Sequence, residues 1–187
     1  MSNSSKEPLI HLIKEGEGSI EHMYLDTVAK VTVGVGNMLP SVSAAQELPF
    51  LQKSDDTAAS AADIAADFEN VARQSPGKIA SSYQSYTQLY LPEDAVNALL
   101  DKRIDRFEAQ LVRDFPGYSD YPEDAQYALM DMVFNLGNRG LVSKFPSLTR
   151  AARDQDWAEC AAQCHRRGIS DHRNEEVHAL FMSAANR

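Results

Sequence analysis

Two acidic residues and one threonine near the N-terminus are of the types that hydrolysis of a glycosidic bond requires. Eight residues separate Glu17 from Asp26, and five separate Asp26 from Thr32. The reaction needs one carboxylic acid that protonates the leaving oxygen and a second carboxylate that attacks or activates water. A hydroxyl beside the second carboxylate can hold that water in line. With 27 acidic residues in the chain, spacing alone gives this pair little weight, and Asp26-Thr27 also fits ordinary turn chemistry.

A helix is expected before this constellation. Leu9, Leu12 and Ile13 share one face at helical spacing, and Pro8 suits a first helical position. The glycines on either side of Glu17 end the helix. Glu17 is therefore expected at a helix terminus and not on a solvated helical face.

A β-hairpin is expected to carry the other two residues. Valines alternate with other residues over 31–35, which predicts a strand. This strand is expected to pair with 24–26 across a turn at 26–30, with Thr32 on the face opposite the valines. A helix end that meets a hairpin would form one wall of a cleft.

The rest of the chain predicts an α+β, mostly helical protein. Ser60 and Asp63 resemble a capping box before an apolar helical stripe, within an irregular insertion at 40–88. We expect one domain with three parts: residues 1–91 with the first helix, the hairpin lobe and the insertion; a connecting helix at 92–113; and a helical lobe at 114–187.

A nearly all-apolar helix that opens at Pro122 and runs to Gly137 predicts the buried centre of the helical lobe. Only Asp131 and Asn135 interrupt it. They are either buried polar groups with internal partners or sugar ligands, and the apolar surroundings favour ligands. Arg166 and Arg167 are interpreted as solvated or capping charges, with contacts to substrate carboxylates in a cleft as the alternative. Cys160 and Cys164 are interpreted as small core residues without a disulfide.

Composition limits the classes of function. The chain has 187 residues, of which 43% are hydrophobic and 24% charged, which suits a globular domain without disulfide or metal. No apolar stretch is long enough for a membrane span. A net charge of −9 without a basic cluster argues against nucleic-acid binding. The histidines lack zinc-site spacing, so no metal or cofactor is expected. The polar N-terminus lacks an export signal, so we expect synthesis in the cytoplasm and delivery by other means.

The residues around the constellation resemble a known signature. Glu17-Gly18, Tyr24-Leu25-Asp26-Thr27 and residues 31–36 (Val-Thr-Val-Gly-Val-Gly) are similar to the catalytic region of the phage-type lysozymes of glycoside hydrolase family 24. The resemblance implies a lysozyme-like fold and cleavage of peptidoglycan with inversion at the anomeric carbon. Glu17 would donate the proton, and Asp26 with Thr32 would orient the water.

The resemblance extends over residues 7–39 and 89–181. Residues 128–137 are similar to the central helix of that family, residues 157–162 to its following Trp-led helix, and Arg173 to an arginine that pairs with the catalytic glutamate. It implies that Gly36, Asp131, Asn135 and Arg173 contribute to substrate binding. Asn37 stands where the family often has histidine, and a changed hydrogen bond is expected there.

The insertion adds a second resemblance. Residues 42–50 look closer to pesticin-like toxins and to muramidase modules of type VI secretion effectors. This implies a monomeric antibacterial effector that acts on peptidoglycan in the periplasm or wall of a target cell, with an immunity protein and a secretion apparatus as partners. The alternatives are a phage endolysin of the same activity and a catalytically silent peptidoglycan-binding module.

Overall fold

The structure is a computed structural model that describes residues 3–187, with side chains for residues 6–137 and 139–187. It is α+β and mostly helical, with two small antiparallel sheets, as the sequence predicted. The chain divides into two compact units. The sheet unit is Glu17–Lys102, and the helical unit combines the N-terminal segment up to Gly16 with Arg103–Arg187. Within residues 3–187, no helix has the length and apolar character of a membrane span.

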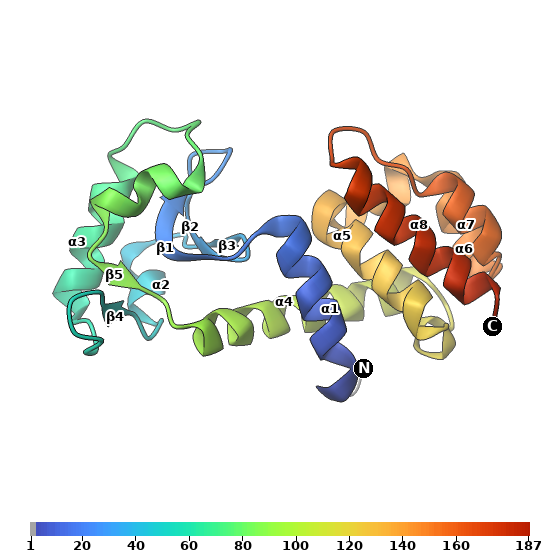
Figure 1. The fold of residues 1–187 in the computed structure, drawn as a ribbon, viewed down its shortest axis with the longest axis horizontal. Helices are drawn as coiled ribbons and strands as arrows, with labels where there is room; N and C mark the ends of the chain where they lie inside the picture. Colours follow the sequence, from blue (N-terminus) through green and yellow to red (C-terminus); the bar gives the residue numbers. More distant parts are fainter. Residues whose placement is uncertain (1–2) are drawn as a thin grey trace. The chain divides into compact units, whose positions relative to one another are not determined.

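The sheet unit contains the predicted hairpin (Figure 1). Strands β1 (Ile20–Leu25) and β2 (Val31–Gly34) are antiparallel, with Leu25 opposite Val31 and Tyr24 opposite Thr32, and β3 (Asn37–Met38) pairs with β2. The hairpin is confirmed, although β1 begins before the predicted 24–26. All four residues of β2 are buried, so both faces of this strand are covered. The alternation of valines therefore predicted the strand correctly, but neither face of the strand is exposed to solvent.

The remainder of the sheet unit is more ordered than its composition predicted. It comprises α2 (Val42–Gln46), β4 (Leu51–Gln52), α3 (Ala61–Ala72), the 3₁₀ helix η1 (Ala80–Tyr86) and β5 (Leu89–Tyr90). The capping box of α3 is confirmed. The Ser60 hydroxyl accepts from the Asp63 amide at 3.2 Å, and the Ser60 amide donates to the Asp63 carboxylate at 3.0 Å. These bonds satisfy two amides that a helix start otherwise leaves without partners.

Two long helices differ in detail from the sequence prediction. Helix α1 (Asn3–Glu17) starts before Pro8, which lies inside it, so the predicted start at Pro8 is wrong. A proline this early costs α1 one backbone hydrogen bond. Helix α4 (Glu93–Asp114) fits the predicted connecting helix, and the boundary between the two units falls within it. The helical unit includes α1, whereas our division grouped that helix with the hairpin.

The helical unit is built around α5 (Glu123–Lys144), whose residues 128–133 are 0% exposed. Its burial confirms the predicted central helix. Gly137, at φ 68° and ψ 160°, interrupts α5 where the sequence predicted an end, and the helix then resumes. The other elements are η2 (Tyr118–Asp120), α6 (Pro146–Arg153), α7 (Trp157–Gln163) and α8 (Asp171–Ala185), with α8 packed against both α5 and α7 (Figure 1). Helix α6 was not predicted from the sequence.

Both cysteines are core residues, as predicted. Cys160 and Cys164 are buried and unbonded to each other. Burial raises the pKa of the Cys160 thiol to about 12 and also raises the pKa of Cys164. Neither thiol is therefore a nucleophile at neutral pH.

Candidate functional site

Asp26 stands at the tip of the hairpin, where the turn fixes its carboxylate. Its Oδ1 accepts from the amides of Val28 at 2.9 Å and Lys30 at 2.8 Å, while its own amide donates to the Lys30 carbonyl at 2.9 Å. Aspartate favours this position because its short side chain bonds to amides further along the same turn. The side chain is half-buried. The result is a carboxylate with a defined orientation at the end of a two-stranded ribbon.

Thr32 meets Asp26 at a shared peptide group. The Thr32 hydroxyl donates to the Lys30 carbonyl at 3.0 Å, the same oxygen that accepts the Asp26 amide. Thr32 is 2% exposed. Its donor is thus committed, and the lone pairs of the hydroxyl oxygen remain as acceptors. The structure brings together two of the three residues that the sequence singled out.

Glu17 is the third residue of the constellation and belongs to the same unit. It is the last residue of α1 and is exposed, which confirms the predicted helix terminus. Gly18 follows at φ 78°. This left-handed conformation suits glycine and turns the chain from α1 into β1.

Gly36 lies between β2 and β3, exposed and at φ 67°. Gly34, two residues earlier, is at φ 66°, and a Cβ there would stand 3.4 Å from the Val96 side chain of α4. Gly34 therefore has a packing role, because it lets β2 approach α4. The role of Gly36 in substrate binding stays a prediction.

Comparison of the sequence with protein-family models and with curated proteins gives no match. Function therefore has to be inferred from the residues and geometry of this chain.

Asp131, which the sequence predicted to be a sugar ligand, is buried in an ion-pair network. It is 0% exposed. Its Oδ1 accepts from Arg173 Nε at 3.0 Å and Nη2 at 2.8 Å, and its Oδ2 pairs with Arg166 Nη2 at 2.8 Å. A sugar hydroxyl has no access to this carboxylate. Asp131 is thus a buried ion-pair residue, and its interpretation as a sugar ligand is wrong.

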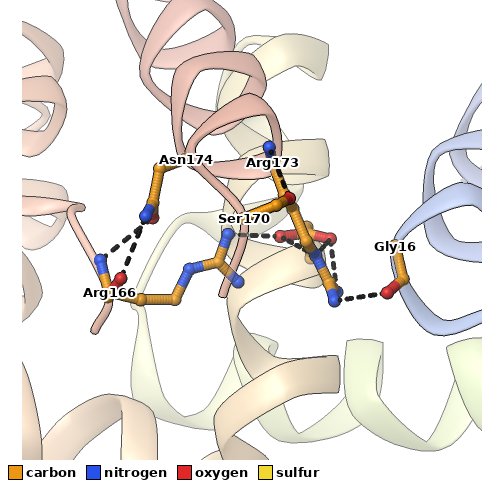
Figure 2. A network of polar contacts seen from close by, with 6 residues as sticks. Gly16, Arg166, Ser170, Arg173 and Asn174 are labelled. Atoms are coloured by element: carbon orange, nitrogen blue, oxygen red, sulfur yellow. Dashed lines mark hydrogen bonds and ion pairs between the residues drawn. The ribbon is translucent and has the colours of Figure 1, made fainter. Parts of the chain in front are cut away.

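Arg166 also differs from its prediction. The sequence predicted a solvated or capping charge, but Arg166 is only 2% exposed and its guanidinium pairs with Asp131. Asn174 fixes its backbone, since the Asn174 side chain accepts from the Arg166 amide at 3.0 Å and donates to its carbonyl at 2.9 Å (Figure 2). Burial lowers the pKa of Arg166, and the neighbouring Asp131 opposes that shift. A fully buried aspartate in an apolar helix was the signal that a cation had to lie nearby.

Arg173 joins this buried network to the end of α1. Besides Asp131, its guanidinium donates from Nη1 to the Gly16 carbonyl at 3.0 Å (Figure 2). A Cβ on Gly16 would lie 2.6 Å from Arg173 Cζ, so only glycine allows this approach. Arg173 therefore holds the residue that directly precedes Glu17. The pairing of Arg173 with Glu17 that the resemblance implies stays a prediction.

Asn135 differs from Asp131 in burial, although both residues interrupt the apolar pattern of α5. It is half-buried, so part of its side chain is accessible in the helical unit. It stays a candidate sugar ligand. Among residues 3–187, no group of three or more His, Cys, Asp or Glu side chains is arranged to hold a metal ion.

Proposed function

We propose that this chain is a lysozyme-like muramidase, which hydrolyses the β-1,4 bond between N-acetylmuramic acid and N-acetylglucosamine in bacterial peptidoglycan. One observation carries the proposal: in the hairpin, the Asp26 backbone amide and the Thr32 hydroxyl donate to the same Lys30 carbonyl, so the two residues lie together. The spacing of these residues from Glu17 at a helix end adds support, because it matches the catalytic spacing of phage-type lysozymes.

The proposed mechanism assigns each residue one task. Glu17 donates its proton to the glycosidic oxygen as the bond to the anomeric carbon breaks. A water molecule attacks that carbon from the opposite face, and its proton passes to Asp26. No described residue donates a hydrogen bond to Oδ2 of Asp26, so this oxygen is the one that we assign to the water. The Thr32 hydroxyl oxygen accepts from the same water and sets its direction.

Replacement of Asp26 by asparagine separates catalysis from turn structure. In Asp26→Asn the amide oxygen can accept the same Val28 and Lys30 amides, so the hairpin is retained while the base is lost. We expect the loss of turbidity of purified peptidoglycan to slow by at least about 10²–10⁴-fold, the usual contribution of general acid-base catalysis. Glu17→Gln should have an effect of the same size.

Asp55 provides a matched control for that variant. It lies in the same unit and also fixes a turn, since its Oδ1 accepts from the Thr57 amide at 3.1 Å and the Thr57 hydroxyl at 2.7 Å. Asp55→Asn should keep wild-type activity. Wild-type activity of Asp26→Asn as well would contradict the assignment of Asp26 as the base.

A catalytically silent peptidoglycan-binding module is the second candidate function. One observation favours it: the Asp26 carboxylate and the Thr32 hydroxyl both make hydrogen bonds that a stable turn needs without any catalysis. Cosedimentation with peptidoglycan, measured beside the turbidity assay, separates the two. A silent module would bind peptidoglycan and leave its glycan strands intact.

We place the enzyme as an antibacterial effector that acts in the periplasm or wall of a target cell. Its net charge of −9 supports this context, because an acidic enzyme gains no long-range attraction to an anionic wall and benefits from delivery next to its substrate. An effector requires an immunity protein in the producing cell. Isolation of a stoichiometric inhibitor from the native host is expected, whereas dependence on a holin for lysis would favour the endolysin alternative.

A further inference from the structure

A pocket of about 360 Å³ opens beside the proposed catalytic base. The end of β1 and the start of the turn line one part of it, from Tyr24 to Thr27, and residues 77–80 line the other. Asp26 is among the lining residues. The second segment comes from the insertion at 40–88, so the pocket exists only because this chain carries that insertion.

Buried side chains fix the loop at 75–80 at both of its ends. The hydroxyl of Tyr83, which is 0% exposed, donates to the Ser75 carbonyl at 2.9 Å. His22 Nε2 donates to the Ala80 carbonyl at 3.0 Å, and burial lowers the pKa of this histidine. Gly77 takes a left-handed conformation at φ 82° between these anchors. The loop is thus pre-organised, which reduces the entropy that a ligand must remove.

This pre-organised loop displays one apolar and one cationic side chain. Ile79 is 74% exposed. Lys78 is exposed as well, with its ammonium 6.0 Å from the centre of the Tyr86 ring. Ile79 and Lys78 both line the pocket. A cation and an apolar side chain that line one pocket fit a ligand that carries a carboxylate and an apolar portion.

We propose that this pocket binds the lactyl-peptide substituent of N-acetylmuramic acid. The inference rests on the proposed function. Of the two sugars in the glycan strand, only muramic acid carries a carboxyl-bearing substituent, and in the wall that substituent is extended by an acidic peptide. Lys78 pairs with a carboxylate of this peptide, while Ile79 contacts its apolar atoms. The insertion therefore selects peptide-bearing glycan over glycan without peptide.

Paired substrates test the selectivity. Wild-type protein and Lys78→Met are assayed on intact peptidoglycan and on glycan strands from which an amidase has removed the peptides. Lys78→Met should lower the ratio of kcat/KM for intact over stripped glycan by about three- to tenfold, mainly through KM. Lys144→Met is the matched control, since Lys144 is exposed at the end of α5 in the other unit. An unchanged ratio in Lys78→Met would overturn the proposal.

Binding by NMR titration keeps the site testable whatever the catalytic result. Muramyl dipeptide should shift the amide signals of 77–80 and 24–27 in wild type, and Lys78→Glu should weaken that binding by at least tenfold. Chitotriose, which lacks the lactyl-peptide, should leave the signals of 77–80 in place. Cleavage of both glycans without these shifts refutes the subsite alone. Shifts without any cleavage refute the proposed activity and leave the subsite standing.

Discussion

Asp131→Asn tests the buried network of the helical unit most sharply. The change removes the negative charge of a carboxylate that two guanidinium groups contact. Arg166 is 2% exposed and Arg173 is 6% exposed, so both cations would lose the charge of the Asp131 carboxylate without gaining water. Removal of one partner of a buried ion pair typically costs about 3–5 kcal/mol in the free energy of unfolding.

This cost is large enough to measure as a shift in Tm. Unfolding entropy near 2.1 cal/mol/K per residue gives about 0.4 kcal/mol/K for the 187 residues of the chain. The expected drop in Tm is therefore about 8–13 °C, followed by circular dichroism. Asp105→Asn is the control, because Asp105 pairs with Lys6 at 2.7 Å but its side chain is 61% exposed. That variant should lose less than about 1 kcal/mol.

Arg166→Met, in contrast, should have little effect on stability. None of the described residues accepts a hydrogen bond from Nε or Nη1 of Arg166, so this buried charge is poorly compensated. Its replacement by an apolar side chain leaves the Asp131–Arg173 pair neutral and should change stability by less than about 1 kcal/mol. Equal losses in Asp131→Asn and Asp105→Asn, or a loss in Arg166→Met as large as that in Asp131→Asn, would refute the reasoning.

Four further variants, at three positions, probe the site and its supports. Gly16→Ala introduces a Cβ 2.6 Å from Arg173 Cζ and should lower the unfolding free energy by about 1–3 kcal/mol, measured by urea denaturation; an unchanged midpoint would mean that the contact is not needed. Burial lowers the pKa of His22, with Lys53 acting in the same direction and the Ala80 carbonyl and Glu21 opposing it. The stability that this neutral histidine provides is full above pH about 6.5 and is lost as the pH falls through its lowered pKa, so His22→Gln should flatten the pH dependence of unfolding between pH 7.5 and 5. Thr32→Ser keeps the hydroxyl and should retain activity, whereas Thr32→Val should reduce kcat; equal rates for the two would exclude a role for the hydroxyl.

The hairpin and the caps could be predicted because their determinants are local. Alternating valines and an aspartate turn specify β1 and β2 within a few residues, and Ser60 with Asp63 specifies the start of α3. Asp26, Thr32 and the end of α1 were placed correctly for the same reason. The start of α1 was missed because its residues before Pro8 are polar. They are compatible with a helix but form no apolar stripe that would predict one.

The buried network could not be predicted because its partners are distant in the chain. Arg166 stands next to Arg167 in a polar segment that reads as solvated, and its partner Asp131 is 35 positions away. Sequence pattern alone assigned Asp131 to ligand binding, since nothing local showed which cation would meet it. The pocket at 77–80 was missed for the same reason, because it forms only when the insertion folds beside the Asp26 turn.

Mass spectrometry of the products from purified peptidoglycan tests the central claim most directly. A muramidase that uses Glu17 as acid and Asp26 as base releases muropeptides with reducing N-acetylmuramic acid ends, and Glu17→Gln releases none above background. Anhydro ends would indicate a lytic transglycosylase, and freed peptides an amidase or peptidase. Either of these products, or reducing ends released by Glu17→Gln at the wild-type rate, would contradict the account.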